Sequence, residues 1–329
     1  MKIKLLLFSL WCCGLFAADP LFADRLEIRE WLVPWEGTVP RDPYVDNRGR
    51  VWFVGQNGNY IGNMSPEDGQ FNRYDLPPGT GPHNLIIDDT QNIWYAGNRK
   101  KYIGILLPTT GQIVQIAMPD RKARDPHTMV FDAAGDIWFT VQKGNFIGKL
   151  TVHDNGVELI EVPTRKSRPY GIIVDPDNSP WAAAFGNNTL LQIDPANMTI
   201  AEIPLPDEDS RPRRLAATSN GDIWYADFAL GRLGRYRPVE KEFTEWPMPG
   251  GADSKPYGMA VDKNDRLWVV ETGIQPNRFI GFDTQTGSFF SETDIPSGGG
   301  SIRHMHYYEK AGEVWFGTDT NYIGRAEVH

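Results

Sequence analysis

The stretch Gly135-Asp136-Ile137-Trp138-Phe139-Thr140 decides the fold, because versions of it recur along the chain. A tight turn rich in Gly and Asp leads into a short strand that carries a tryptophan, as in one hairpin of an antiparallel sheet. Such tryptophans recur every 42 to 47 residues, at Trp52, Trp94, Trp138, Trp181, Trp224, Trp268 and Trp315. Repeats of roughly 40–50 residues are typical of β-propeller blades. The sequence therefore predicts an all-β, seven-bladed propeller.

Two further markers accompany each tryptophan. A proline stands twelve residues before six of the seven, at Pro40, Pro82, Pro126, Pro169, Pro212 and Pro256, and the last repeat has Ile302 near that place. A third strand with an Ile-Gly pair follows in most repeats, as in Tyr60-Ile61-Gly62, and Phe279-Ile280-Gly281 is its expected counterpart in blade six. Blade four is the weakest copy, since Ala182-Ala183-Ala184 follows its tryptophan and no Ile-Gly pair is present.

The two ends of the chain complement each other. The last repeat stops after its third strand, whereas residues 26–34 resemble an isolated fourth strand such as residues 242–247. We expect the N-terminal strand to complete the last blade and close the ring, which removes exposed sheet edges. Residues 24–329 are therefore predicted to form one propeller domain.

The N-terminus has the pattern of a secretory signal. Met1-Lys2-Ile3-Lys4 precedes an apolar run over residues 5–18, which is too short for an ordinary membrane-spanning helix. Residues 1–23 are predicted to be a signal peptide, cleaved after Ala18 or Ala23, and the mature protein is predicted to be periplasmic or secreted without a membrane span. Both cysteines, Cys12 and Cys13, lie inside this segment. The mature chain then has no disulfide and no thiolate chemistry.

The formal charge of −9 argues against nucleic acid as a partner, and we expect a monomer. Loops at one end of a propeller concentrate binding groups. The residues that follow the repeat prolines are expected to ring the central opening: Arg41, His83, His127, Tyr170, Arg213, Tyr257 and Arg303. Basic side chains gather here although the whole chain is acidic. We therefore predict a small-molecule ligand that is anionic or strongly polar, held by Arg41, Tyr170, Arg213, Tyr257 and Arg303.

The histidines suggest acid–base chemistry. His83 and His127 hold equivalent positions in consecutive blades and are expected to lie close together. With Asp125 they could shuttle a proton or help to hold a metal ion, or they could be structural. His304 and His306 could line the channel or be ordinary strand residues. Asp227 and Glu271, in matching positions of consecutive blades, are expected to make structural bonds, with cation binding as the alternative.

The repeat resembles the virginiamycin B lyase family, also called streptogramin lyases, over essentially all of the mature chain. Three segments carry the resemblance: Pro169-Tyr170-Gly171-Ile172, the stretch from Gly135 to Thr140, and Asn145-Phe146-Ile147-Gly148-Lys149-Leu150. The resemblance implies a seven-bladed propeller that linearises a cyclic depsipeptide at its ester by elimination, with Mg²⁺ assisting. It also implies a catalytic set with Pro-His in one blade, and Glu-Pro-His plus a glutamate four residues past the tryptophan in the next.

This sequence departs from that catalytic set. The family places it in the last two blades, where this chain has Pro256-Tyr257 and Ile302-Arg303. The closest match lies in blades two and three, with Pro82-His83, Asp125-Pro126-His127 and, four residues past Trp138, Gln142.

These residues favour an enzyme, a carbon–oxygen lyase that opens a lactone or ester by elimination. His127, His83 and Asp125 would be catalytic, Gln142 would contact substrate, and Asp125 would approach any Mg²⁺. Two alternatives stay open. One is a non-catalytic propeller that binds a ligand or partner at a cationic mouth, and the other is a metal-dependent lactone hydrolase.

Overall fold

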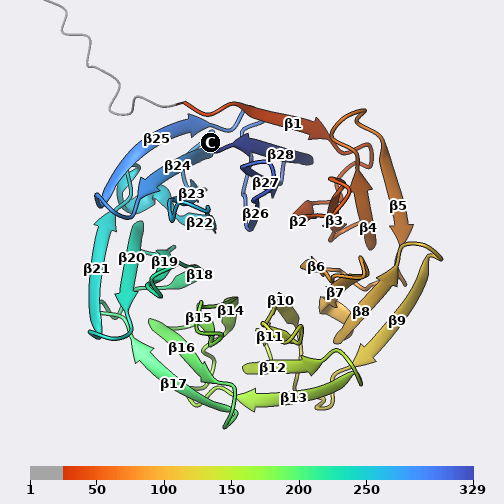
Figure 1. Ribbon diagram of the computed structural model, residues 1–329, viewed down its shortest axis with the longest axis horizontal. Helices are drawn as coiled ribbons and strands as arrows, with labels where there is room; N and C mark the ends of the chain where they lie inside the picture. The colour runs from red at the N-terminus through yellow and green to blue at the C-terminus, as the bar shows by residue number, and fades with distance from the viewer. Residues whose placement is uncertain (1–24) are drawn as a thin grey trace, which may run out of the picture.

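The computed structural model describes residues 25–329, which form a closed ring of seven antiparallel sheets with four strands each (Figure 1). The predicted signal peptide, residues 1–23, lies outside the described residues. Two short 3-10 helices, η1 (Asn98–Lys100) and η2 (Gly251–Ser254), interrupt the strand pattern. Among residues 25–329, no helix has the length and apolar character needed to cross a membrane.

Each blade runs from an inner strand at the central channel to an outer strand at the rim. Blades one and two are β2 (Pro40–Val45), β3 (Val51–Gly55), β4 (Tyr60–Met64), β5 (Phe71–Asp75) and β6 (Leu85–Ile87), β7 (Ile93–Gly97), β8 (Tyr102–Leu107), β9 (Gln112–Ala117). Blades three and four are β10 (Pro126–Phe131), β11 (Ile137–Val141), β12 (Phe146–Thr151), β13 (Gly156–Glu161) and β14 (Pro169–Val174), β15 (Pro180–Ala184), β16 (Thr189–Asp194), β17 (Thr199–Pro204).

The remaining three blades complete the ring. Blades five and six are β18 (Pro212–Ala217), β19 (Ile223–Asp227), β20 (Arg232–Arg237), β21 (Glu242–Pro247) and β22 (Pro256–Val261), β23 (Leu267–Glu271), β24 (Arg278–Asp283), β25 (Ser288–Asp294). Blade seven is β26 (Met305–Tyr308), β27 (Glu313–Gly317), β28 (Tyr322–Glu327) and, from the N-terminus, β1 (Ile28–Leu32).

Strand β1 closes the ring as the sequence predicts. It pairs antiparallel with β28, and Trp31 lies opposite Ile323 in the register. The Trp31 ring also stacks on Trp315 of the same blade, with 5.4 Å between ring centroids. Glu30 accepts hydrogen bonds from the backbone N–H and the hydroxyl of Ser297, which ties β1 to the end of blade six. The first and last segments of the domain are thus joined by pairing, stacking and hydrogen bonds.

The seven repeat tryptophans are all buried, and their indole N–H groups all have acceptors. In five blades the acceptor is an aspartate six residues earlier in the hairpin turn, as in Asp132 with Trp138 at 3.0 Å. In the two other blades the Thr218 hydroxyl accepts the hydrogen bond from Trp224, and the Glu313 carboxylate accepts the one from Trp315. Because a buried indole N–H without a partner is costly, the turn residue and the tryptophan form one unit. This unit explains why both recur.

The Ile-Gly pair has a steric cause. Gly148 lies opposite Phe139 in the register of β11 and β12, and a Cβ atom there would overlap the Phe139 ring. In blade four the small and the large residue change places: Ala182 stands where the other blades have the aromatic residue, and Leu191 stands where they have the glycine. The predicted equivalence of Phe279-Ile280-Gly281 was wrong by one residue. Gly281 lies opposite Trp268 itself, and a Cβ atom there would overlap the rings of both Trp268 and Phe290, so its missing side chain makes room for these two rings.

The hydrophobic core is divided among the blade interfaces. Seven buried clusters each join two neighbouring blades; one of them, for example, packs Trp138 and Ile147 of blade three against Ile172 and Leu191 of blade four. The core is therefore a ring of packed interfaces around the channel. This rigid ring positions the ends of the inner strands, where the candidate site lies.

Candidate functional site

A bulge at the start of the inner strands turns side chains into the mouth of the channel. In five blades the pairing of inner and second strands shifts register just after the repeat proline, as between Pro126 and Met129 of β10. A bulge leaves residues unpaired and re-aims their side chains. Five of the predicted ring residues lie at or beside these bulges, His83 and Arg303 precede the inner strands of the two other blades, and the structure brings all seven together.

The two predicted catalytic histidines are neighbours. The ring centroids of His83 and His127 are 3.5 Å apart, and Tyr170 follows at 4.0 Å from His127. Both imidazoles are buried, with 5% and 2% of their surface exposed. Burial first, and then arginines that include Arg41 and Arg214, lower the pKa of each histidine well below its ordinary value. Both imidazoles are therefore neutral at physiological pH.

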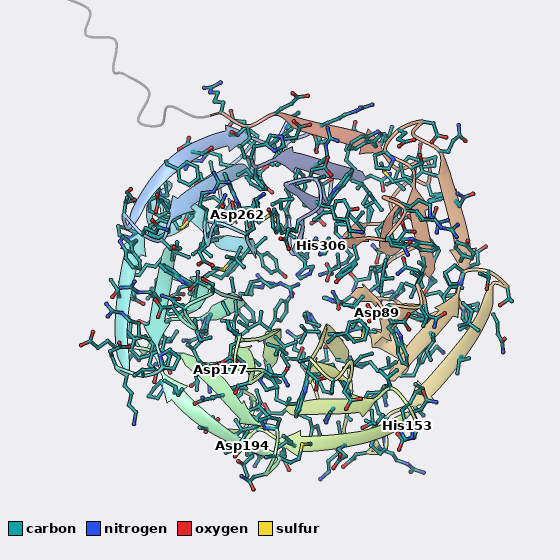
Figure 2. All side chains as sticks on the ribbon, in the orientation of Figure 1. Asp89, His153, Asp177, Asp194, Asp262 and His306 are labelled. Atoms are coloured by element: carbon teal, nitrogen blue, oxygen red, sulfur yellow. The ribbon has the colours of Figure 1, made fainter. Side chains whose placement is uncertain are left out.

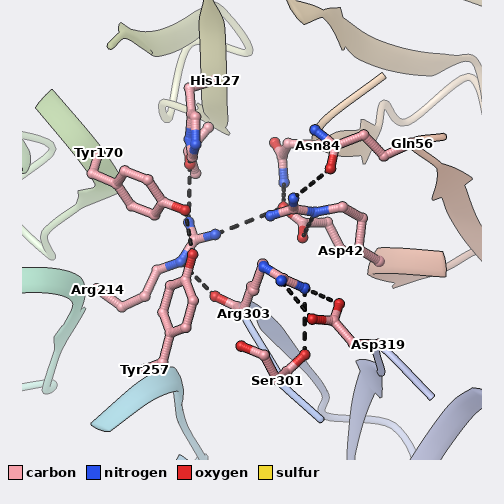
Figure 3. Close-up of polar contacts among 12 residues, drawn as sticks. Asp42, Gln56, Asn84, His127, Tyr170, Arg214, Tyr257, Ser301, Arg303 and Asp319 are labelled. Atoms are coloured by element: carbon pink, nitrogen blue, oxygen red, sulfur yellow. Dashed lines mark hydrogen bonds and ion pairs between the residues drawn. The ribbon is translucent and has the colours of Figure 1, made fainter. Parts of the chain in front are cut away.

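Four arginines lie around these imidazoles. The Arg41 Nε donates to Asp42 at 3.1 Å, and its Nη1 donates to Gln56 at 2.9 Å. Arg303 pairs with Asp319 through both guanidinium nitrogens. The two other arginines, Arg213 and Arg214, come from β18, and Figure 3 shows the Arg214 guanidinium at the centre of the group.

A second ring of residues lies one position further along each blade, and the sequence had pointed only to its His304 as a residue of the channel. Its members are Asp42, Asn84, Thr128, Gly171, Arg214, Gly258 and His304. The same repeat alignment contains this ring, so one more step along each blade would have found it. Two of its seven positions are glycines. A Cβ at Gly171 would lie 3.1 Å from the Cα of Arg214 and closer still to the preceding carbonyl oxygen, so glycine leaves room for the β18 backbone.

Arg214 is the hub of this second ring. Its Nη1 donates to the Thr128 hydroxyl at 2.9 Å, and its Nε donates to the carbonyl oxygen of Arg303 at 2.8 Å. Its Nη2 lies 3.8 Å from Asp42, which also accepts a hydrogen bond from Asn84. Burial opposes ionisation of Asp42, but Arg41 and Arg214 beside it hold its pKa below the ordinary value. Contacts from three other blades therefore hold one guanidinium across the channel (Figure 3).

The mouth also has an aromatic wall. The Arg213 guanidinium lies over four rings, at 3.8 Å from the centroid of Tyr257, 4.3 Å from Phe228, 4.5 Å from Phe185 and 5.1 Å from Tyr170. The hydroxyls of Tyr170 and Tyr257 are hydrogen-bonded to each other across the channel (Figure 3). The two phenylalanines were not predicted, since they follow the second strand outside the repeated proline context. Flat rings and cations combine here in one surface.

Asp125 and Gln142 lie on loops beside the mouth, outside the group formed by the imidazole pair and the arginines. Asp125 has a left-handed backbone (φ 75°), and its carboxylate lies 3.5 Å from the Lys143 ammonium. Burial raises the pKa of Asp125, against the opposing effects of Lys143 and Asn98. Gln142 follows β11, and its backbone N–H donates to the Asp125 carbonyl oxygen at 3.0 Å. Both residues lie on the loops beside the mouth, with the Asp125 carboxylate engaged by Lys143 and Asn98.

The mouth does not suit magnesium. Mg²⁺ prefers oxygen ligands such as carboxylates and water. Here the two imidazoles face guanidinium groups, and the carboxylate of Asp42 is already paired with arginines. Among residues 25–329, no three or more His, Cys, Asp and Glu side chains gather in a way that could hold a metal ion. The residues present therefore do not fit the metal that the family resemblance implies.

Asp227 and Glu271 make structural bonds, as expected. Asp227 accepts backbone N–H groups from Arg211 and Ala229, and Glu271 accepts from Gly250 and pairs with Arg278 at 2.5 Å.

The other histidines fall into two groups. His304 and His306 line a channel cavity of about 370 Å³ below the mouth, among apolar side chains such as Met129 and Ile172. Burial is the main cause that lowers the pKa of His304 to about 4 and that of His306 to about 3. His153, by contrast, is exposed and lies near the outer rim, whereas His306 lies near the channel (Figure 2).

Comparisons with known proteins agree on the fold. Virginiamycin B lyase from Staphylococcus aureus superposes with a TM-score of 0.84 at 23% identity, over 93% of this chain and 100% of that one. A catalytically inactive variant of that enzyme, determined with quinupristin, gives 0.83 at 24% identity over 93% and 100%. Hydrazine synthase from Kuenenia stuttgartiensis gives 0.74 at 12% identity, over 88% and 96%. No curated protein sequence matches the chain. At these identities the structures establish the fold alone.

The sequence itself matches the virginiamycin B lyase family over residues 22–278. This range covers more than half of the chain and includes the imidazole pair, the tyrosine pair, Arg41 and Arg214. The match, the seven-bladed architecture and the superposed lyase structures agree. The chain belongs to the virginiamycin B lyase family.

Proposed function

We propose that this protein is a carbon–oxygen lyase that acts on a small substrate with a carboxylate group, and that it opens a lactone or ester by elimination. One observation carries the proposal: a cluster of four guanidinium groups with excess positive charge, two of them buried and two partly exposed, lies against a pair of neutral imidazoles. The cluster supports anion binding, and the imidazoles support removal of a proton.

The mouth carries more positive than negative charge. Four guanidinium groups, those of Arg41, Arg213, Arg214 and Arg303, face two carboxylates, those of Asp42 and Asp319. Several buried nitrogens here have no hydrogen-bond partner, namely Nη2 of Arg41, Nη2 of Arg214, Nε of Arg213 and Nδ1 of His83. Burying charged or polar donors without partners is costly. An anionic ligand would satisfy these donors, which favours a carboxylate-bearing substrate.

His127 is the better placed base. Its Nδ1 lies 2.9 Å from the Thr128 hydroxyl, which also accepts a hydrogen bond from Arg214. A hydroxyl oxygen has two lone pairs, so Thr128 can accept from both groups. In that tautomer the Nε2 of His127 carries the free lone pair, and it would take the proton next to the substrate carbonyl. His83, whose ring is tilted against that of His127 at 3.5 Å between centroids, holds the imidazole in place and disfavours a second positive charge.

Arginines would supply the electrostatic part of the reaction. Removing a proton next to a carbonyl develops negative charge on the carbonyl oxygen, and fixed donors in a water-poor site stabilise that charge. Arg41 and Arg214 are held by hydrogen bonds before any ligand arrives. Since the mouth does not fit magnesium, no step of this proposal requires it, and activity should survive a chelator.

The amino-terminal sequence supports a location for this activity. Because residues 1–23 have the pattern of a secretory signal, we propose that the lyase works in the periplasm or outside the cell.

The test is mass spectrometry of lactones and cyclic depsipeptides, with and without a free carboxylate, after incubation with the purified protein. Elimination gives a ring-opened isomer of unchanged mass, whereas hydrolysis adds one water. We expect isomer formation from the carboxylate-bearing members, in chelator as well as in magnesium. His127→Ala should lower the rate by about 100-fold or more, and the matched control His153→Ala should not.

The outcomes separate the competing functions. A product heavier by one water that disappears with chelator would indicate the metal-dependent hydrolase. Binding of carboxylates without any product would leave the non-catalytic, anion-binding propeller, which the guanidinium cluster also supports. Full activity of a folded His127→Ala protein would refute the assigned base.

A further inference from the structure

The hydroxyl pair of Tyr170 and Tyr257 is a buried feature that anion binding does not explain. The two tyrosines come from strands β14 of blade four and β22 of blade six. Their hydrogen bond therefore links the two blades on either side of blade five (Figure 3). Tyr170 is 4% exposed and Tyr257 is 1% exposed. Positioning a flat ring for ligand contact would not need the hydroxyls to meet. The Tyr170 ring also lies 4.0 Å from the imidazole of the base His127, measured between ring centroids, so the hydroxyl pair belongs to the same site.

Positive charge surrounds this hydroxyl pair. The guanidinium carbons of Arg213 and Arg214 lie 5.1 Å and 5.2 Å from the centroid of the Tyr170 ring. Arginine cations stabilise a phenolate more than a phenol. Burial opposes ionisation, but Arg213, Arg214 and Arg41 lower the pKa of Tyr170 below its ordinary value. The pKa of Tyr257 is raised, by burial and then by the neighbouring Tyr170. The pair thus has one acidic member and one that remains a donor.

We propose that Tyr170 is the general acid of the elimination and protonates the departing oxygen while His127 removes the proton. The proposal rests on the proposed function and extends it to a second class of substrate. An ester releases a carboxylate, which needs no proton to depart. An ether at the same position releases an alkoxide, which does. The Tyr170 donor therefore assigns the site to β-alkoxy or β-aryloxy acids as well as to esters.

The step balances without a cofactor. His127 Nε2 takes the proton next to the carbonyl, and the electron pair of that C–H bond becomes the new C=C bond. The bond from the β-carbon to oxygen breaks, the oxygen keeps its electron pair, and it receives the proton of the Tyr170 hydroxyl. The products are an unsaturated acid and an alcohol. Transfer of a proton from the His127 imidazolium to the Tyr170 phenolate, whose ring lies 4.0 Å away, restores both groups.

The charged and titratable groups around Tyr170 come from six blades: Arg41 and Asp42 of β2, His83 before β6, His127 of β10, Arg213 and Arg214 of β18, Tyr257 of β22, and Arg303 with its partner Asp319 in blade seven. The arginines keep their charge across the accessible pH range. The positive charge around Tyr170 therefore stays constant while Tyr170 titrates.

The first experiment needs no substrate. Phenolate formation is followed by near-ultraviolet absorbance as pH is raised. We expect the wild-type protein to show one tyrosine that ionises at lower pH than the rest, and Tyr170→Phe to lose that step. Tyr95→Phe is the matched control, because Tyr95 is also buried and hydrogen-bonded to a tyrosine, Tyr102 at 3.3 Å, while burial raises its pKa. An early step that persists in Tyr170→Phe would overturn the assignment.

The second experiment varies the leaving group. A series of 3-aryloxypropanoates that differ in the acidity of the departing phenol is compared with matched acyloxy esters. A general acid contributes about 100- to 10,000-fold. We expect Tyr170→Phe to lose a factor in that range more for the poorest leaving groups than for the matched esters, and to depend more steeply on phenol acidity than wild type. Parallel slopes would overturn the role of Tyr170 alone, whereas absence of turnover for every compound would overturn the proposed function as well.

Discussion

Acid should destabilise this propeller through its channel histidines, and His306→Phe isolates one contribution. His306 stacks on Tyr44, with 3.9 Å between ring centroids, and it is half-buried in the channel cavity. Phenylalanine keeps the ring and the stacking but cannot take up a proton. The substitution lies below the mouth and leaves the candidate site intact.

The magnitude follows from the pKa difference between the folded and unfolded chain. Burial, with a smaller effect of His304, lowers the pKa of His306 in the folded protein to about 3. In the unfolded chain it is about 6.5. As pH falls below about 6.5 the unfolded state binds the proton first, so stability is fully present above that pH and is lost toward pH 3. The loss is about 1.4 kcal/mol per pH unit, an upper limit because the cavity admits some water.

The assay is urea unfolding followed by tryptophan fluorescence at pH 8, 6.5, 5.5 and 4.5. The free energy of unfolding should fall less with acid in His306→Phe than in the parent. Measured from pH 8, the difference should be about 1.4 kcal/mol at pH 5.5 and about 2.8 kcal/mol at pH 4.5. His153→Phe is the control, since its side chain stays in water when the chain folds, and it should decline in parallel with the parent. If the His306→Phe and parent curves are also parallel, burial of a neutral His306 is refuted.

Two further predictions concern the fold. Asp132→Ala removes the acceptor of the buried Trp138 indole and of two turn N–H groups, and should lower the free energy of unfolding by about 1–3 kcal/mol, with Asp132→Asn losing less; urea unfolding measures both. Trp31→Ala removes the stacked ring that closes blade seven and should cost about 3–5 kcal/mol in the same assay, whereas an unchanged midpoint would contradict the closure by β1.

The fold was predictable because each blade repeats its chemistry. Tryptophan spacing predicted the number of blades, and the isolated strand of residues 26–34 predicted the closure that β1 and β28 show. The misaligned Gly281 shows where such reasoning fails. A glycine shows that a side chain is excluded, but only the structure shows which neighbours exclude it, here Trp268 and Phe290.

The site was predictable in part. Positions after the prolines led to the imidazole pair and to five other residues that the structure places at the mouth: Arg41, Tyr170, Arg213, Tyr257 and Arg303. Asp42 and Arg214 were missed because the bulges present two consecutive positions to the channel, and a bulge leaves little mark on the sequence. Neither the hydroxyl pair of Tyr170 and Tyr257 nor the hub role of Arg214 follows from local pattern. Both depend on contacts between blades that are far apart in the chain.

The central claim, that the mouth binds an anionic group, is tested most directly by calorimetric titration with benzoate and with benzamide, which share shape and differ in charge. We predict that benzoate binds at least about tenfold more tightly, or about 1.4 kcal/mol, and that Arg41→Gln removes this preference. Arg168→Gln, which removes the same charge from the exposed rim, should keep it. Equal affinity for the two compounds, or a preference that survives Arg41→Gln, would contradict the account.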